Sequence, residues 1–232
     1  MTNSLKISAI IPAKDEAAAI AAVIESLQSL KEQGRPLIHR IIVVDNLSND
    51  DTAMIAKKKG AVVVFEPQPG YGSACMAGIH ALVSTELVLF IDGDNSCDSN
   101  DIPEMIRAIA EGADMVVGSR ILGTIEPHAM TWTQRIGTHL ICRLIQLRTG
   151  IPVSDLGPLR VIHFDRLLEL NMRDRRFGWT AEMQIKAYRR GLKVAEVPVR
   201  LKTRIGKSKI SGTWRGTLLA AYDLLRAVLL RC

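Results

Sequence analysis

Two aspartates lie one residue apart in the stretch FIDGDNSCD, residues 90–98, directly after the apolar run LVLF. On a segment that leaves a buried strand, Asp92 and Asp94 can turn toward one cleft. Their carboxylate oxygens are the ligands that Mg²⁺ and Mn²⁺ prefer, and such ions keep open positions for substrate phosphates. Asp-Gly-Asp-Asn is also ordinary turn chemistry, so a turn without a metal is the competing interpretation.

The elements that would position this pair are visible in the first half of the chain. The runs KISAIIP, LIHRIIVVD, AVVVF, LVLFID and ADMVVGS predict strands. Helical spacing of apolar residues predicts helices near residues 17–27, 51–59, 72–84 and 101–111. Strands that are apolar on both faces and joined by helices are typical of βαβ units. The expected fold class is therefore α/β, with a mostly parallel central sheet flanked by helices.

Ligands of such open sheets bind beyond the carboxyl ends of the strands. The segments expected there are 12–16, 45–51, 92–95 and 118–120, and three of the four are acidic. This clustering favours the metal interpretation of Asp92 and Asp94 over the turn. The first strand is followed by PAKDE instead of G-x-G-x-x-G, and the sequence has no G-x-x-x-x-G-K-[ST] loop, which disfavours dinucleotide oxidation and P-loop chemistry.

Positive charge is concentrated near the C-terminus. The net charge is +6, and residues 186–232 contain 12 Lys and Arg against 2 Asp and Glu. This pattern predicts a polyanionic partner, which is nucleic acid, an anionic membrane surface or a phosphorylated substrate.

Length and composition suit one large domain of 232 residues, 47% of them hydrophobic. We expect a cytoplasmic protein, because no stretch is apolar enough for a membrane span and MTNSLKISAIIPAKDE lacks the layout of a secretory signal. The scattered cysteines and histidines suggest neither a disulfide framework nor a zinc site.

Several motifs resemble those of one enzyme family. IIPAKDEAAAI is similar to a first strand and loop, VVDNLSNDDT to a VDDGSxDGT turn, GYGSACMAGI to a glycine-rich helix start, and IDGDN to the D-x-D metal signature. Together they resemble the family 2 glycosyltransferases, which use nucleotide sugars and have the GT-A fold. DLGPLRVI and the block from WTAEMQ to KSKISG resemble segments of the polyprenyl-phosphate sugar synthases, the dolichyl-phosphate mannose synthase group. The likeness spans nearly the whole chain.

The resemblance implies roles for individual residues. The donor nucleotide would lie beside Pro12, Lys14, Glu16, Val44, Asp45 and Asn46. Asp92, Gly93 and Asp94 would hold Mg²⁺ or Mn²⁺ and the pyrophosphate, with Ser96 at the position of a third metal ligand. Arg120, Arg204, Lys207 and Lys209 would contact phosphates.

Some positions depart from the family pattern. Lys14 replaces a usual Tyr, Asn46 an Asp, and Ser96 a Gln or similar residue. These changes leave the nucleobase and the third metal ligand open. Arg204 and Lys209 are one residue closer than the family spacing, so Lys207 and Lys209 are alternatives for one phosphate contact.

The acceptor is inferred from an absent acid. A hydroxyl acceptor usually needs a carboxylate base, but Trp179 and Thr180 stand where the family has its acidic pair, and we expect a structural role for the remaining Glu182. A lipid monophosphate, with a second pKa of about 6, is largely a dianion at neutral pH and needs no strong base. We therefore expect inverting transfer of a hexose from a UDP- or GDP-sugar to a polyprenyl phosphate. The predicted catalytic residues are Asp94, Arg204 and Lys209, with Asp155 orienting the acceptor.

Other functions remain as alternatives. A glycosyltransferase with a soluble acceptor and a silent nucleotide-sugar sensor both keep the same donor site. A nucleic-acid-binding protein is disfavoured by only 3 Tyr, 4 Phe and 3 Trp and by the absence of a recognised RNA or DNA motif.

Two apolar helical stretches have two interpretations each. Residues 130–147, with Trp132, Ile136, Leu140 and Leu144, predict a core helix or part of a lipid groove. The C-terminal face of Trp214, Leu218, Tyr222, Leu225 and Leu229 predicts packing on the domain or contact with an anionic membrane at its inner face. The expected organisation is a GT-A domain over 1–211, with a donor and metal half (1–120) and an acceptor half with the basic loop (121–211), followed by an amphipathic helix over 212–232.

Overall fold

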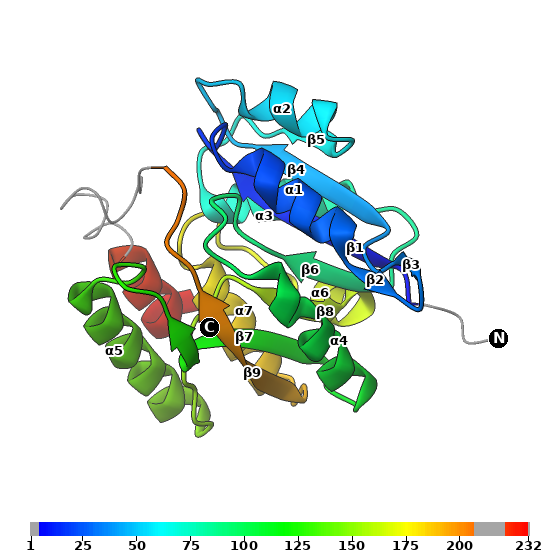
Figure 1. Ribbon diagram of the computed structural model, residues 1–232. Helices are drawn as coiled ribbons and strands as arrows, with labels where there is room; N and C mark the ends of the chain where they lie inside the picture. Colours follow the sequence, from blue (N-terminus) through cyan, green and yellow to red (C-terminus); the bar gives the residue numbers. More distant parts are fainter. Residues whose placement is uncertain (1–4, 207–220, 232) are drawn as a thin grey trace.

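A seven-stranded sheet organises the chain in the computed structural model, which describes residues 5–206 and 221–231 (Figure 1). The strands stand in the order β5-β4-β1-β6-β8-β7-β9. Their bounds are Ile7–Ala13 (β1), Arg40–Asp45 (β4), Val62–Phe65 (β5), Leu87–Phe90 (β6), Met115–Ile125 (β7), Arg160–His163 (β8) and Val194–Leu201 (β9). β8 runs antiparallel to β6 and β7, and the other neighbours are parallel. The predicted mostly parallel sheet is confirmed. The short strands β2 (Lys31–Glu32) and β3 (Arg35–Pro36) form a separate hairpin.

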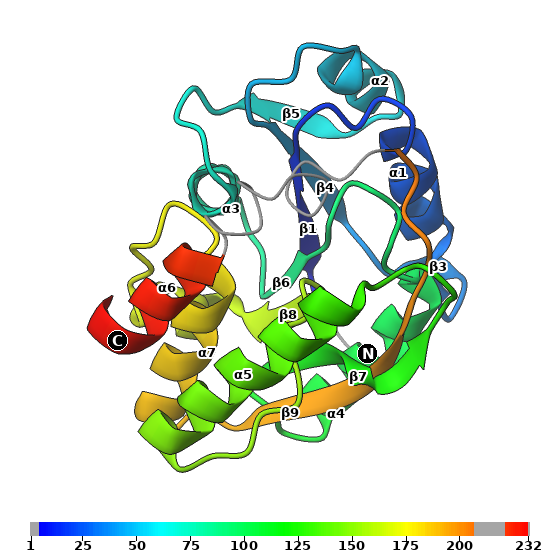
Figure 2. The same cartoon turned by 90° about the vertical axis from the view of Figure 1, so that its left-hand side faces the viewer.

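Helices cover both faces of the sheet, and Figure 2 shows α1 and α3 on opposite sides of β1. One face carries α1 (Ile20–Ser29), α2 (Thr52–Lys58) and α4 (Ile102–Ala110), which follows the short helix η1 (Ser99–Asp101). The other face carries α3 (Tyr71–His80), α6 (Phe164–Leu170) and α7 (Trp179–Arg189). Each predicted helix of the first half is confirmed to within a few residues. None of the helices within the described residues is both long and apolar enough to cross a membrane.

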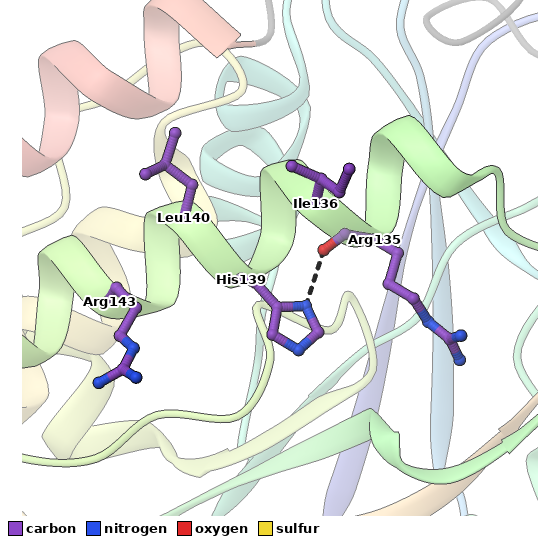
Figure 3. Close-up of a pocket in the computed structure, with 5 residues that line it drawn as sticks. All are labelled: Arg135, Ile136, His139, Leu140 and Arg143. Atoms are coloured by element: carbon purple, nitrogen blue, oxygen red, sulfur yellow. Dashed lines mark hydrogen bonds between the residues drawn. The ribbon is translucent and has the colours of Figure 1, made fainter.

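Helix α5 (Trp132–Thr149) packs outside these layers. It begins with a capping box between Thr131 and Gln134 and ends at Gly150 in the left-handed conformation. Its buried side, Ile141, Cys142 and Ile145, packs with residues of α7 and of the C-terminal helix. The interpretation of Trp132, Ile136 and Leu140 as core residues is wrong, because all three are exposed. Figure 3 shows Ile136 and Leu140 on one side of the helix.

The C-terminal helix packs beside α5. Residues 221–226 are α-helical and η2 (Ala227–Arg231) continues them as a π-helix. Arg148 of α5 donates from Nη1 to the carbonyl oxygens of Val228 and Leu229, both at 2.6 Å. The buried packing side chains are Ala227 and Val228. Of the predicted face, Leu225 is partly buried and packs against the same cluster, whereas Tyr222 and Leu229 are exposed. Trp214 and Leu218 lie outside the described residues.

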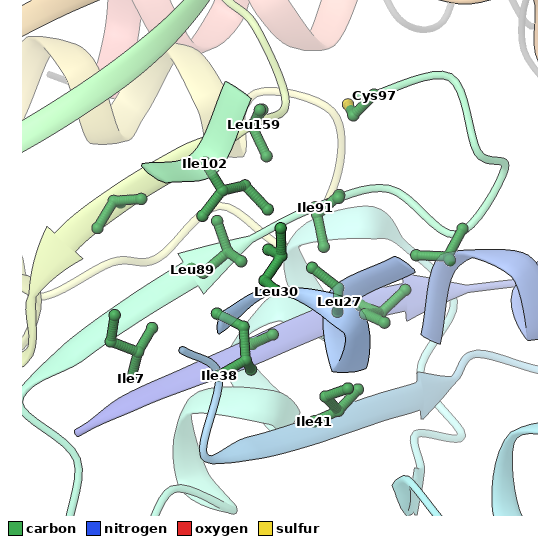
Figure 4. Packing of buried hydrophobic residues seen from close by; sticks show 14 of the residues in the cluster. Ile7, Leu27, Leu30, Ile38, Ile41, Leu89, Ile91, Cys97, Ile102 and Leu159 are labelled. Carbon is green, nitrogen blue, oxygen red and sulfur yellow. The ribbon is translucent and has the colours of Figure 1, made fainter. Parts of the chain in front are cut away.

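The core follows from the alternation of side chains along the central strands. Ile7, Ala9 and Ile11 of β1 join the cluster under α1 and α4, which Figure 4 shows from close by, while Ile10 joins the cluster under α3. Both faces of β1 are therefore buried, as the apolar runs predict.

Two predicted limits, the end of the strand near residue 118 and the boundary at residue 120, differ in the structure. Residues 118–120 do not follow a strand, because β7 continues to Ile125 with a register irregularity between Ser119 and Thr124. The predicted boundary at residue 120 falls inside β7, and β8 and β9 join the sheet of the first half. The division into halves and the start of the last helix stay predictions.

Candidate active site

The ends of β1 and β4 bring the predicted donor residues together. The parallel register pairs Pro12 with Val44 and Ala13 with Asp45, and the backbone N–H of Asn46 donates to Ala13 at 2.8 Å. Apolar residues drive both strands into the core, so the polar residues that follow them emerge at the same sheet edge.

The loop after β1 is tied to the turn after β4. The backbone N–H of Asp15 donates to Ser48 Oγ at 2.9 Å, and that of Glu16 donates to Thr52 Oγ1 at 2.8 Å. Asp15 adopts a positive φ of 50°. The turn thus holds the Glu16 carboxylate, which is nearly buried, at the sheet edge, whereas Lys14 is exposed.

The side chain of Asn46 braces the chain after β5. Its Nδ2 donates to the carbonyl oxygens of Glu66 and Gln68 at 2.9 and 2.8 Å, and its Oδ1 accepts from Gly70 N–H at 2.8 Å. An aspartate could not make the two donated bonds. This explains physically why an amide stands where the family pattern has an acid.

Asp92 and Asp94 follow β6 at the same edge. Asp94 is buried, and its Oδ1 accepts from Ser96 N–H at 2.9 Å around the turn at Asn95, which has a φ of 62°. Asp92 is half-buried. Burial and, second, the Asp94 charge raise the pKa of Asp92 to about 7, against the opposing effects of a Tyr71 hydrogen bond and of Arg120 and Arg204. Two crowded carboxylates of this kind favour a bound cation.

Arg204 supplies a cation from the far end of the sequence. Its Nη1 lies 3.4 Å from Asp94 Oδ2, and its Nη2 lies 3.3 Å from Glu16 Oε1. The backbone N–H groups of Lys202 and Ile205 donate to the carbonyl oxygens of Ser96 and Asp94 at 2.8 and 2.9 Å. The segment after β9 therefore runs along the acidic turn. Arg204 Nε is buried without a hydrogen-bond partner among the described residues, so it is available to an acceptor oxygen.

Arg120 is held by Asp155. The guanidinium donates from Nε and Nη2 to the two carboxylate oxygens at 2.8 and 2.7 Å, and the backbone N–H groups of Arg120 and Leu156 also donate to the carboxylate. Asp155 is completely buried. Its carboxylate is thus occupied by these contacts, and it orients Arg120, whose charge in turn acts on Asp92.

Glu182 is also occupied. It accepts the backbone N–H groups of Arg173 and Asp174, at distances from 2.7 to 3.1 Å, and forms an ion pair with Lys186 at 2.6 Å. These bonds anchor the loop that precedes α7, as the expected structural role requires.

Three features of the site were not predicted. Arg160 is buried and donates to Gly157 O, Thr180 O and Gln184 Oε1, and burial lowers its pKa to about 10. Tyr71 is a further group that lowers the pKa of Asp92. The loop at 174–176 closes on the start of α3, where Gly72 and Ser73 donate backbone N–H groups to Arg176 O and Arg175 O. The DLGPLRVI segment contains Arg160, but nothing in its pattern separates this arginine from its neighbours.

Comparison with known proteins identifies the family. Residues 8–168 match the family Glycosyl transferase family 2. The chain belongs to this family. An uncharacterised glycosyltransferase of Mycobacterium tuberculosis is 37% identical over 96% of this chain and 97% of its own length. A dolichyl-phosphate hexose transferase of Haloferax volcanii is 29% identical over 84% of this chain and 82% of its own length.

Solved structures agree with the fold of this glycosyltransferase. Glucosyl-3-phosphoglycerate synthase of Mycobacterium tuberculosis, in complex with Mn²⁺, UDP and glucosyl-3-phosphoglycerate, superposes with a TM-score of 0.77. The match covers 98% of this chain and 80% of that chain at 24% sequence identity. The predicted GT-A fold is confirmed.

The glycosyltransferase brings most of its predicted site residues to one edge of the sheet. The residues there are Pro12, Glu16, Val44, Asp45, Asn46, Asp92, Gly93, Asp94, Ser96 and Arg204. The partly exposed Arg120 and the buried Asp155 form an ion pair beside them. Lys207 and Lys209 lie outside the described residues, so their phosphate contacts stay predictions. The roles of the other residues in donor and metal binding are likewise predictions.

The acidic pair fits a divalent cation. Asp92 and Asp94 provide hard oxygen ligands, and burial, followed by the charge of Asp94, raises the pKa of Asp92. The described residues contain no group of three or more His, Cys, Asp or Glu side chains suited to a metal. Substrate phosphates and water would have to complete the coordination, which is the usual arrangement for Mg²⁺.

Proposed function

We propose that this glycosyltransferase transfers a hexose from a UDP- or GDP-linked sugar to a polyprenyl phosphate, with Mg²⁺ or Mn²⁺ and with inversion at the anomeric carbon. One observation supports the choice of acceptor. The two carboxylates that could act as a base for a hydroxyl acceptor, Asp155 and Glu182, are both occupied by other contacts. Asp155 is bound to Arg120, and Glu182 is bound to backbone N–H groups and Lys186. A hydroxyl acceptor would need a free base of this kind, whereas a phosphate dianion does not.

The donor assignment rests on the acidic turn and Arg204. Asp92 and Asp94 would hold the divalent cation, which when bound supplies charge neutralisation to the leaving diphosphate. Arg204 adds a positive charge at the same point, and its guanidinium would donate to a phosphate oxygen. Arg120, fixed by Asp155, contributes a second positive charge near Asp92.

The transfer step balances without a proton acceptor. A phosphate oxygen of the acceptor donates an electron pair to the anomeric carbon, and the bond from that carbon to the nucleotide diphosphate breaks. The diphosphate leaves with the bonding pair and is stabilised by the cationic groups at the sheet edge. Attack from the face opposite the leaving group inverts the configuration.

A soluble phosphorylated acceptor is the second candidate. Structures of the glucosyl-3-phosphoglycerate synthase from Mycobacterium tuberculosis contain phosphoglyceric acid with UDP-glucose and Mn²⁺. The sequence relative named dolichyl-phosphate hexose transferase, which matches over 84% of this chain, supports the lipid acceptor instead.

The test is an incubation of the purified protein with Mg²⁺, a panel of UDP- and GDP-sugars, and a short polyprenyl phosphate. We expect nucleotide diphosphate release that depends on the lipid phosphate, and radiolabelled sugar that partitions into organic solvent. The matched acceptor is the corresponding polyprenol, which lacks the phosphate and should be inert. Equal use of polyprenol, or transfer to 3-phosphoglycerate alone, would overturn the lipid-phosphate proposal.

The matched protein control is Asp94→Ala, which we expect to abolish metal-dependent turnover while the protein stays folded by circular dichroism. Turnover by the wild-type protein that survives EDTA would contradict the metal role of Asp92 and Asp94.

A further inference from the structure

Helix α5 exposes a row of large apolar side chains. Trp132, Ile136, Leu140 and Leu147 are 74%, 59%, 55% and 83% exposed. The first three follow each other at intervals of four residues, which places them along one side of the helix. A row of this size differs from the scattered surface leucines of ordinary proteins and marks an interaction surface.

Two cationic side chains, Arg135 and Arg143, form a row beside the apolar one. Both are exposed, as is His139 between them, and the three recur every four residues. Figure 3 shows Ile136 and Leu140 on one side of the helix and the two arginines and His139 on the other. These five residues line one shallow hollow, and a second hollow at the start of the helix is lined by Trp132 and Arg135. The helix contains no Asp or Glu.

The neighbouring C-terminal helix repeats this chemistry. Tyr222, Arg226 and Leu229 are exposed and are spaced for one helix face. The two helices are joined by the bonds from Arg148 to Val228 and Leu229. The acid of this helix, Asp223, is buried. Exposed aromatic residues, leucines and cations are typical of helices that lie in a membrane interface.

The charge of this surface selects its occupant. A second copy of the chain would place cationic rows against each other if the α5 faces met symmetrically, which costs energy. An anionic phospholipid surface complements the same row, and long arginine side chains can reach lipid phosphates while the helix lies at the acyl boundary.

We propose that the exposed face of α5 docks the enzyme on an anionic phospholipid bilayer. The apolar row (Trp132, Ile136, Leu140 and Leu147) enters the interface, and the cationic row (Arg135 and Arg143) contacts lipid phosphates. The inference stands on this surface and not on the identity of the acceptor. If the proposed lipid acceptor is also correct, docking brings the enzyme to the surface that contains it.

The test is flotation of the purified full-length protein with vesicles of phosphatidylcholine alone or mixed with phosphatidylglycerol. We expect wild-type protein to float with the phosphatidylglycerol vesicles and to be released by high salt, because the attraction is partly electrostatic. Loss of both Arg135 and Arg143 in the variant Arg135→Gln/Arg143→Gln should weaken vesicle binding by about 25-fold, or about fivefold for each cation.

Control variants come from α2, which lies at the opposite end of the molecule from α5 (Figure 1). Leu140→Glu should abolish flotation, whereas Met54→Glu, at a position of nearly the same exposure (54% against 55%), should not. Lys57→Gln/Lys58→Gln removes the same charge as the arginine pair from two exposed positions and should leave binding unchanged. A blue shift of tryptophan fluorescence on vesicle addition should be lost in Trp132→Phe, which would place this helix at the lipid.

Several results would overturn the proposal. They are failure of the wild-type protein to bind, equal binding by the α5 variants, or a dimer in solution that Leu140→Glu dissociates without any vesicle binding. Turnover with a water-soluble short-chain polyprenyl phosphate separates this proposal from the proposed function. The α5 variants should retain that turnover. If the wild-type protein floats with the vesicles but shows no such turnover, only the proposed function would be refuted.

Discussion

Arg204 and Asp94 contact each other across 110 residues of sequence, with Nη1 3.4 Å from Oδ2. The two were assigned to different ligands, one to phosphate and the other to the metal. Their separation exceeds the 2.7–2.9 Å usual for a charge-assisted hydrogen bond. The bidentate pair of Arg120 and Asp155 has such short distances, 2.7 and 2.8 Å. Arg204 is therefore the arginine that a ligand can displace from its carboxylate, while Arg120 is fixed.

Replacement of Arg204 should separate metal binding from turnover. In Arg204→Ala, a cation that competes for Asp94 is lost, so we expect tighter Mn²⁺ binding to the substrate-free protein by isothermal titration. Turnover of the nucleotide sugar should fall about 100-fold or more, since one charged donor to the leaving group is removed. Arg200→Ala is the matched control, because Arg200 is an exposed arginine on β9 that pairs with Asp98. Parallel loss of metal affinity and turnover in Arg204→Ala would contradict this account.

The pH dependence of stability should report the Asp92 carboxyl. Its pKa of about 7 lies above its ordinary value of 3.8, so the folded protein binds the proton more tightly than the unfolded chain. The resulting stabilisation is complete below pH 4 and is lost as the pH rises through 7. Mg²⁺ should therefore raise the melting temperature more at pH 8 than at pH 5. The check is thermal denaturation across this range, and Asp92→Asn should remove this contribution to the slope. An unchanged slope in Asp92→Asn would assign the effect to other groups.

The sheet edge could be predicted because its causes are local. The apolar run 87–90 buries a strand, so Asp92 and Asp94 must emerge at its carboxyl end, where the ends of β1 and β4 also lie. The run EVPV likewise predicts a strand, β9, which leads to Arg204. Hydrophobic pattern and parallel pairing together bring these residues to one place.

The remaining features depend on contacts that no local pattern encodes. The strand β8, Arg160–His163, contains only two apolar residues, and so short a pattern does not encode strand direction, so its antiparallel pairing could not be predicted. Arg120 was expected beyond a strand end, yet pairing with β9 extends β7 to Ile125. The exposure of Trp132 and Leu140 could not be predicted, because both sides of α5 contain apolar residues and tertiary packing selected Ile141 and Ile145.

The pair of Arg120 and Asp155 permits a test between a structural and a base role for Asp155. Asp155→Asn leaves a nearly buried arginine without its counter-charge, so we expect the free energy of unfolding to fall by about 3–5 kcal/mol. The pH profile of kcat should keep its shape, since the carboxylate contacts Arg120 and backbone N–H groups. The double variant Arg120→Met/Asp155→Leu should recover only part of the lost stability and no turnover, because the backbone N–H groups of Arg120 and Leu156 still lose their acceptor. Loss of one limb of the pH profile in Asp155→Asn would show that Asp155 is a base.

The glycines at the start of α3 are required by packing within the chain. A Cβ atom at Gly72 would lie 2.1 Å from Asp174 O and 2.9 Å from Arg175 C, both backbone atoms that cannot move aside alone. We expect Gly72→Ala to displace the loop at 174–176 and to lower the free energy of unfolding by about 1–3 kcal/mol. Turnover should fall as well, because the preceding residue, Tyr71, lowers the pKa of Asp92. The matched control is Gly137→Ala on α5, where nothing lies within 4 Å of the added atom. Alanine lowers the conformational entropy of the unfolded chain relative to glycine, so that variant should be about 0.5–1 kcal/mol more stable. Urea denaturation of both variants measures the contrast. A Gly72→Ala protein as stable as the wild type would mean that the loop at 174–176 yields without cost, and that Gly72 has another role.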